Sequence, residues 1–306
     1  MLAARSKKMR MTRTRRSRIR RVAESVFKLF GFLEFVCYRA NNALQTSRYE
    51  IACPKLPLAF DGYTIVQISD LHGKEFGKDN ETLLRAVEKE TPDLVVITGD
   101  VVDDRHFQPD KLRVFLERLV RLAPVFYVVG NHEADFFDEY FNATLSIVRE
   151  SGVVDLLDQE TSVTRGVHGD SIVIAGVRDP AFDEPYYELL DQKLARFSNK
   201  TNDFRILLSH RPEGFDLYAR HGFDLVFSGH AHGGQFRFPI LCPQGLNAPG
   251  QGWFPKLTAG IHVKDATTTI VSRGLGPSVI PTRLFNRPEL VVCQLRRNAA
   301  EGVEKR

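Results

Sequence analysis

Five short polar motifs, each lying directly behind a short apolar run, constrain this chain more than any other feature of its sequence. The apolar runs occupy residues 64–68, 94–97, 125–129, 205–208 and 225–227. The motifs that follow them are Ser69-Asp70-Leu71-His72, Gly99-Asp100, Gly130-Asn131-His132-Glu133, Ser209-His210 and Gly229-His230-Ala231-His232. Apolar runs of this length indicate buried strands, and α/β proteins place their chemistry in loops at the carboxyl ends of strands. The five motifs are therefore expected to meet in one site.

The side chains of these motifs predict a metal centre. Carboxylate, imidazole and amide ligands together suit divalent ions such as Mn, Fe or Zn, whereas Mg and Ca prefer oxygen ligands alone. A lone histidine is more often a surface or core residue than a ligand, but this ordered set favours ligands and is large enough for two ions. The candidate ligands are Asp70, His72, Asp100, Asn131, His210, His230 and His232.

In their order along the chain, the motifs resemble those of the calcineurin-like metallophosphoesterase superfamily. The stretch from Gly229 to Gln235 is similar to the G-H-x-H-G-G-Q signature of a bacterial branch that contains phosphodiesterases. Three C-terminal stretches match the same branch, at residues 273–276, 281–283 and 286–290. Each motif alone would be weak, but the ordered set, which spans roughly residues 58–295, is specific.

This resemblance implies a four-layer αββα sandwich that holds two divalent ions, and it assigns a role to each motif residue. One ion would be held by Asp70, His72 and His232, and the other by Asn131, His210 and His230. The resemblance makes Asp100 the bridge between the ions. It makes His132 the general acid that protonates the leaving oxygen; the alternative for His132 is simple packing behind the ligands.

The activity implied by the resemblance is metal-dependent hydrolysis of a phosphodiester or pyrophosphate bond, in which two ions activate water and neutralise phosphoryl charge. Known activities of this branch include general phosphodiester hydrolysis and cleavage of UDP-2,3-diacylglucosamine in lipid A synthesis. We expect a membrane-associated substrate such as UDP-2,3-diacylglucosamine. A general phosphodiesterase or a nuclease is the alternative. A non-catalytic, metal-bound interaction scaffold is a less favoured alternative, because it would require loss of metal ligands and none has been lost.

Outside the motifs, helical and strand patterns alternate, which predicts an α/β (α+β) fold with two sheets flanked by helices. Helices are expected at residues 81–90, 110–122, 143–151 and 186–197, and further strands at 162–165, 171–175, 268–271 and 290–295. The 306 residues, 43% of them hydrophobic, fit one large domain. We expect this domain at residues 58–297, preceded by a connector at 41–57 and followed by a tail at 298–306.

Basic charge is concentrated at the N-terminus. Residues 1–21 contain ten of the 42 Lys and Arg residues and no acidic residue, which leaves 32 basic against 38 acidic residues in the rest of the chain. Such a tail is usually disordered when free and is attracted to anionic surfaces. The body is net negative, which disfavours nucleic acid as a partner.

Residues 22–40 predict an amphipathic helix with one apolar stripe, formed by Val22, Val26, Leu29, Phe30, Leu33, Val36 and Cys37. Lys28 and Glu34 would be costly inside a bilayer. We therefore expect a helix on an anionic membrane surface beside the basic tail, at the cytoplasmic face. Alternatively the stripe packs on the enzyme itself, or it spans and the positive-inside rule places the domain outside. Nothing in the sequence indicates the oligomeric state.

The sequence leaves three further groups open. Asp103 and Asp104 are expected in a solvated loop, and Arg178 with Asp179 stands where relatives often carry an acidic pair, without an assigned role. An aromatic group could either wall a substrate pocket or simply pack, and its members are Phe236, Phe238, Trp253 and Phe254.

Overall fold

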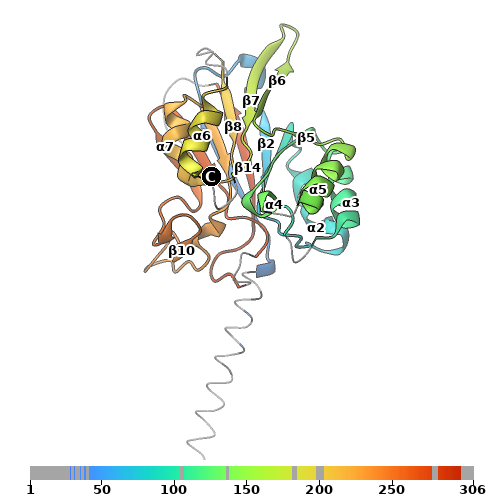
Figure 1. The fold of residues 1–306 in the computed structure, drawn as a ribbon, viewed down its shortest axis with the longest axis vertical. Coiled ribbons are helices and arrows are strands. Elements are labelled where there is room, and N and C mark those ends of the chain that lie inside the picture. Colours follow the sequence, from blue (N-terminus) through green and yellow to red (C-terminus); the bar gives the residue numbers. More distant parts are fainter. Residues whose placement is uncertain are drawn as a thin grey trace, which may run out of the picture.

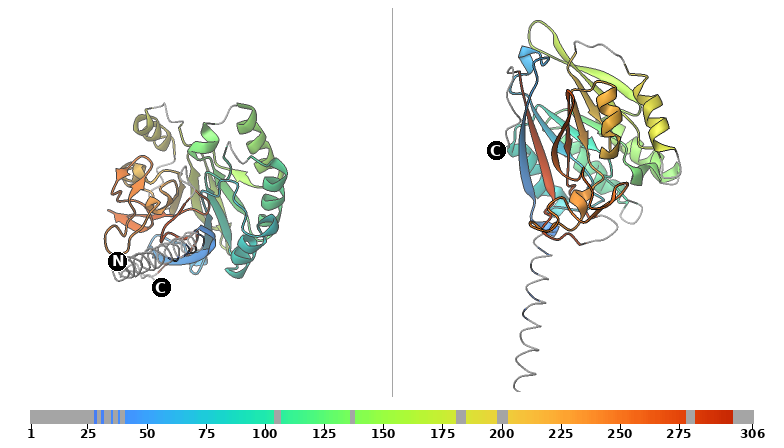
Figure 2. Two further views of the ribbon diagram at one scale, coloured as in Figure 1. Left: turned by 90° about the horizontal axis from the view of Figure 1, so that it is seen from below. Right: turned by 90° about the vertical axis from the view of Figure 1, so that its left-hand side faces the viewer.

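Two six-stranded sheets form a sandwich with helices on both outer faces (Figure 1, Figure 2). This computed structural model describes residues 28, 31, 35, 38, 41–103, 107–135, 138–180, 185–197, 203–277 and 282–297. The first sheet has the order β1 (Gln45–Ala52), β14 (Glu289–Arg296), β2 (Thr64–Ile68), β3 (Leu94–Thr98), β4 (Val125–Val128) and β5 (Val154–Asp155). The second has the order β12 (Gly260–Lys264), β13 (Thr267–Val271), β9 (Leu225–Ser228), β8 (Arg205–Leu208), β7 (Asp170–Gly176) and β6 (Gln159–Arg165). The expected four-layer αββα architecture is confirmed.

The hydrophobic core fills the three spaces between these four layers. Between the sheets, Ile65 and Val96 of the first sheet share one buried cluster with Ile206 and Phe227 of the second. The outer face of the first sheet is covered by α2 (Glu81–Lys89), α3 (Pro109–Leu119) and α5 (Asp138–Glu150). That of the second sheet is covered by α6 (Tyr186–Leu194) and α7 (Phe215–Arg220). Strands buried on both faces read as continuous apolar runs, which is why five of them were visible in the sequence.

The helices and strands predicted between residues 64 and 295 are present, and their ends differ by a few residues. The helix expected from residue 143 begins earlier, at Asp138, and the helix expected to end at residue 197 ends at Leu194. The helix expected from residue 110 begins at Pro109, a residue whose fixed φ suits the first turn of a helix. The shorter elements include α4 (Asn131–Ala134), β10 (Asn247–Ala248) and β11 (Gly252–Trp253).

The expected connector at residues 41–57 is wrong in one respect, because it contains the strand β1. This strand pairs in parallel with β14 along its whole length, from Gln45 opposite Glu289 to Ala52 opposite Arg296. Only Tyr49 and Ile51 of β1 are buried. The strand therefore lacks the apolar run that marks the central strands, and its partner lies at the far end of the chain.

The terminal segments lie mostly outside the described residues. Within the expected helix at 22–40, Lys28, Gly31, Phe35 and Tyr38 are helical and exposed, but its apolar stripe is not described. The basic tail at 1–21 and the tail at 298–306 also lie outside the described part. Among the described residues, no helix combines the length and apolar character needed to cross a bilayer.

The sheet topology brings the five motifs to one edge of the sandwich. Strands β2, β3 and β4 run parallel in the first sheet, and β8 and β9 run parallel in the second. Hydrogen bonds join their loops: Asp70 N–H donates to Gly99 O at 3.0 Å, and His230 N–H donates to a carboxylate oxygen of Asp70 at 3.0 Å. The second bond crosses from one sheet to the other, so it fixes how the two halves of the site face each other.

Candidate metal centre

The backbone of the site is held in an unusual conformation. Five of the seven candidate ligands adopt φ angles between 45° and 64°, a left-handed region that non-glycine residues rarely enter: Asp70, His72, Asp100, His230 and His232. Such strain persists where the surrounding structure enforces it, and it clusters at functional sites. These residues lie in the loops that follow β2, β3 and β9, and their ligand atoms come close together there.

Two glycines allow the motif loops to approach one another. A Cβ atom on Gly130 would lie 2.2 Å from an oxygen of Asp100. A Cβ atom on Gly229 would lie 2.0 Å from the hydroxyl of Ser69 and 2.4 Å from an oxygen of Asp70. Both distances are far below van der Waals contact, so the glycine in each of these motifs is required by close packing around the two carboxylates.

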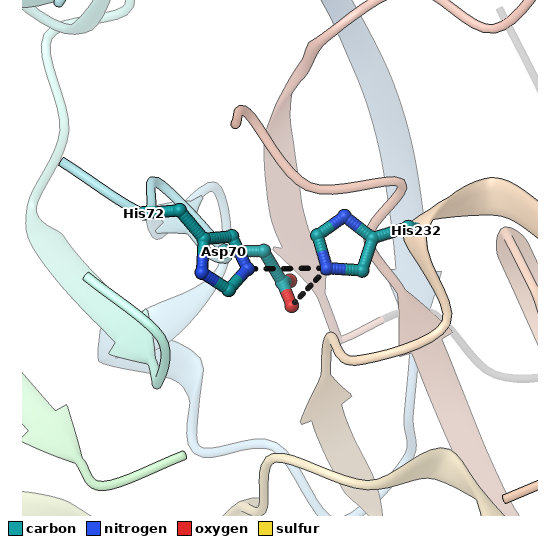
Figure 3. A group of neighbouring side chains, drawn as sticks. All are labelled: Asp70, His72 and His232. Carbon is teal, nitrogen blue, oxygen red and sulfur yellow. Dashed lines mark hydrogen bonds and ion pairs between the residues drawn. The ribbon is translucent and has the colours of Figure 1, made fainter. Parts of the chain in front are cut away.

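A first group of ligand atoms is formed by Asp70, His72 and His232, which are all buried (Figure 3). The Nε2 atoms of His72 and His232 lie 3.2 Å apart, and His232 Nε2 lies 3.4 Å from Asp70 Oδ1. Two imidazole nitrogens aimed at each other at this distance leave at least one lone pair without a donor unless a proton or a cation lies between them.

A second group surrounds His210 Nε2. This nitrogen lies 3.0 Å from Asn131 Oδ1, 3.2 Å from His230 Nδ1 and 3.2 Å from Asp100 Oδ2. The opposite nitrogen, His210 Nδ1, lies 2.7 Å from the carbonyl oxygen of Thr98 and donates to it. That bond leaves the Nε2 lone pair free to face an ion, the arrangement usual for histidine ligands.

Asp100 lies between the two groups. Its Oδ2 atom is 3.2 Å from His210 Nε2 in the second group and 3.7 Å from His72 Nε2 in the first. Its Oδ1 atom accepts a hydrogen bond from the backbone N–H of His132 at 2.9 Å. One carboxylate oxygen is thus directed at both groups, the position that a bridging ligand needs.

The electrostatics of the protein alone show that these residues fit cations. Burial lowers the pKa of His72 to about 4, so that imidazole is neutral and available as a ligand. For His210, burial also lowers the pKa, but the adjacent Asp100 carboxylate outweighs it and raises the pKa to about 10. A proton held between His210 and Asp100 marks a place of negative potential that a divalent ion can occupy instead.

Glu133 has a structural role that the sequence did not show. Its buried carboxylate accepts the backbone N–H groups of Asp100 at 2.8 Å, Val101 at 2.6 Å and Gly130 at 3.0 Å. Burial raises the pKa of Glu133 to about 8. Because it ties the loop after β3 to the loop after β4, Glu133 holds Asp100 in its left-handed conformation.

His132 lies beside the ligands and is partly exposed. Its ring packs edge-on against the ring of His72, with 4.7 Å between centroids. One ring nitrogen of His132 falls in a group with ligand atoms of His72 and Asp100. The side chain can therefore reach a substrate from the solvent side, as a proton donor must. Its contact with His72 also fits the alternative role of packing behind the ligands.

The structure places most of the residues that the sequence left open. Asp179 is buried and pairs with Arg211 through Nε and Nη2, at 2.8 Å each. Asp103 is half-buried, with an oxygen 3.9 Å from His72 Nδ1, so it is not simply a solvated loop residue. Asp104 lies outside the described residues. Trp253 and Phe254 are 69% and 68% exposed, which excludes ordinary packing for both.

Comparisons with known proteins agree with this geometry. Residues 63–234 match the family of calcineurin-like phosphoesterases. The metallophosphoesterase YkuE of Bacillus subtilis is 28% identical over 270 residues, covering 87% of this chain and 90% of that protein. A metallophosphoesterase of Aquifex aeolicus is 30% identical over 256 residues, covering 83% and 92%.

A relative with a named activity is more distant. The phosphodiesterase YaeI of Escherichia coli is 24% identical over 241 residues, covering 76% of this chain and 82% of that protein. The family implies divalent metal ions and hydrolysis of phosphoesters, and the buried groups around Asp100 offer suitable ligands. The chain therefore belongs to the calcineurin-like phosphoesterase family.

Proposed function

We propose that this protein is a dinuclear metal-dependent phosphoesterase that hydrolyses a phosphodiester or pyrophosphate bond in a membrane-associated substrate. The observation that carries the proposal is the position of Asp100, with one oxygen directed at two separate groups of buried ligand atoms. The first ion would be held by Asp70, His72 and His232 with Asp100, and the second by Asn131, His210 and His230 with Asp100. The mixed nitrogen and oxygen set suits Mn, Fe or Zn.

When bound, two such ions lower the pKa of water and neutralise charge on the transferring phosphoryl group. The protein's own residues do the rest. The hydrogen bond to the Thr98 carbonyl fixes which nitrogen of His210 faces inward. Glu133 fixes the Asp100 loop, and His132, on the open side, donates a proton to the leaving oxygen.

The membrane assignment is supported by two features at one end of the domain. Residues 41–44 (blue) and the loops around β10 (orange) lie at the same end in Figure 1 and Figure 2. These loops carry large apolar side chains that face solvent: Ile240 (94% exposed), Leu241 (84%), Trp253 (69%) and Phe254 (68%). Exposed aromatic and aliphatic tips, at the end where residues 41–44 continue the basic N-terminal sequence, suit the interfacial region of an anionic bilayer.

The sharpest form of the proposal is cleavage of the pyrophosphate in UDP-2,3-diacylglucosamine, a lipid-linked substrate of the cytoplasmic membrane face. A general phosphodiesterase is the second candidate. A nuclease is less well supported, because the chain beyond the basic tail carries more acidic than basic residues, whereas single-strand binding needs a basic groove with stacking aromatic residues.

The test is a substrate panel with the full-length protein loaded with Mn. Initial rates would be measured on bis-p-nitrophenyl phosphate, p-nitrophenyl phosphate, a UDP-linked acyl sugar and single-stranded DNA. Preference for the UDP-linked acyl sugar supports the proposal, and preference for DNA selects the nuclease. No turnover of any ester, with two ions bound per chain, would overturn it.

A further inference from the structure

A pocket with a volume of about 370 Å³ opens directly beside the candidate metal centre. It shares the ligand His72 with that centre, and its wall combines residues 72–74 with residues 41–42 and with Pro277 and Arg283 near the C-terminus. The lining residues are Asn41, Asn42, His72, Gly73, Lys74, Pro277 and Arg283. Its size lies at the lower end for small-molecule sites, so it suits a headgroup or a phosphoryl group rather than a whole lipid.

The wall of this pocket carries two cations and no carboxylate. Arg283 is only 1% exposed, and its guanidinium donates to the carbonyl oxygens of Arg273 at 2.7 Å and Gly276 at 3.0 Å. Among the described residues, no carboxylate lies within ion-pair distance of Arg283 or Lys74. The carboxylates of Asp70 and Glu289 act on Arg283 only from beyond ion-pair distance, and the pocket wall itself presents only positive charge to a ligand. Both cations would therefore stabilise an anion bound in the pocket.

The two cations are placed for different tasks. The N–H groups of Arg283 are directed at carbonyl oxygens and at His232 Nδ1, 3.2 Å from Nη2, so its charge acts on the pocket mainly through space. The ammonium group of Lys74 has three donors, and the described protein acceptor is the carbonyl oxygen of Asn41. Its ammonium also lies 4.7 Å from the centre of the Phe76 ring, which supports its position. Lys74 therefore has donors left for a ligand.

We propose that this pocket binds a second anionic phosphoryl group, adjacent to the one held at the metal centre, and so selects pyrophosphate-linked substrates over simple diesters. The inference rests on the proposed function and deepens it. A phosphoryl group held at the centre would lie near His72, which also lines the pocket. A pyrophosphate carries its second phosphoryl group one bridging oxygen away. Lys74, two residues after His72, meets that group directly.

The pocket is also tied to the N-terminal segment. Asn41 and Asn42 are helical and line its wall, and the Asn41 side chain accepts the backbone N–H of Arg283 at 2.7 Å. The wall is thus completed by the residues that join the expected membrane-surface helix to the domain. A pyrophosphate headgroup arriving from a bilayer would meet the pocket at this junction.

The test compares Lys74→Gln with wild type and with Lys74→Arg, which keeps the charge. Lys89→Gln is the matched control, because Lys89 is an exposed lysine of α2 outside the pocket. With Mn-loaded protein, Lys74→Gln should lower kcat/KM for a UDP-linked sugar by about tenfold or more, the effect of losing one charge-assisted hydrogen bond. The loss of kcat/KM on bis-p-nitrophenyl phosphate should be several times smaller. Lys74→Arg should retain most of the wild-type kcat/KM on the UDP-linked sugar.

A binding measurement supplies a second readout that does not depend on turnover. Calorimetry would compare methylenediphosphonate with methylphosphonate, using inorganic phosphate as a competitor. Wild type and Lys89→Gln should prefer the diphosphonate about tenfold, and Lys74→Gln should lose most of that preference. The pocket assignment would be overturned if Lys74→Gln lost equal activity on the UDP-linked sugar and on bis-p-nitrophenyl phosphate and kept the wild-type preference for the diphosphonate. A wild-type protein inactive on every ester would instead overturn the proposed function.

Discussion

Glu213 Oε1 lies 3.6 Å from His230 Nε2, and among the described residues neither atom has a hydrogen-bond partner. Both side chains are buried, and the other nitrogen of the ring, His230 Nδ1, faces His210 in the second ligand group. A histidine that binds a metal through one nitrogen usually donates its other N–H to a carboxylate or carbonyl group. Glu213 is the carboxylate placed on that side of the ring to accept it.

This relationship predicts the behaviour of Glu213→Gln. The amide keeps the volume but loses the charge that orients His230 and increases its basicity. We expect the affinity of one of two ions to fall about 10- to 100-fold, while the other ion and the fold are retained. Titration of metal-free protein with Mn, followed by elemental analysis, measures this. Two ions bound with wild-type affinities would contradict the role of Glu213.

Asp100→Asn tests the bridge between the two ligand groups. The amide oxygen cannot neutralise two neighbouring cations, so the variant should bind at most one ion per chain and hydrolyse bis-p-nitrophenyl phosphate negligibly. The same substitution removes the carboxylate that raises the pKa of His210. Elemental analysis and circular dichroism of the purified variant give the result. A folded variant with two ions and intact turnover would show that Asp100 does not bridge the ions.

The sequence predicted the parts of this site that are local and missed those that depend on distant contacts. The candidate ligands were recognisable because each follows a buried apolar run and belongs to an ordered set. Strand β1 was missed because only Tyr49 and Ile51 are buried in it, and because it pairs with a strand more than two hundred residues away.

Tertiary structure also explains the functional residues that had no local signal. Glu213 follows His210 closely in the sequence, but its partner His230 comes from the loop after a different strand. Lys74 and Arg283 line one pocket although they are far apart along the chain. The left-handed backbone of the ligands is set by hydrogen bonds between loops, such as those that Glu133 accepts. The residue types alone do not predict this conformation.

His132→Ala separates proton transfer from metal binding. A general acid matters most when the leaving group is a poor one such as an alkoxide, and p-nitrophenolate departs without it. The variant should keep both ions and lose about 10²-fold or more on alkyl phosphodiesters, with a much smaller loss on the aryl ester. Rates on both ester types, with metal content as the control, give the answer. An equal loss on both would indicate a packing or ligand role.

Deletion of residues 1–40 tests the electrostatic part of membrane binding. Each basic residue near an anionic surface contributes about 1 kcal/mol through a field that salt screens. The full-length protein should therefore sediment with vesicles containing phosphatidylglycerol, less so as salt rises, and the truncated protein should lose most of this binding. The deletion stops before every described strand and every candidate ligand, so hydrolysis of bis-p-nitrophenyl phosphate should persist. Resistance of the full-length protein to extraction by high salt and carbonate would point to a spanning segment instead.

Trp253 is an intrinsic fluorescence probe of the exposed apolar loops, because it is the single tryptophan of the chain. It is 69% exposed and lies beside Phe254, so in solution its emission should be that of an indole in water. On vesicles of phosphatidylglycerol and phosphatidylcholine, emission should shift to shorter wavelength, and lipids brominated on their acyl chains should quench it. Leu241→Ser, which leaves the fluorophore in place, should weaken both effects because less apolar surface enters the bilayer. Full sedimentation with vesicles but neither shift nor quenching would show that these loops remain in water and that the N-terminal segment alone binds the membrane.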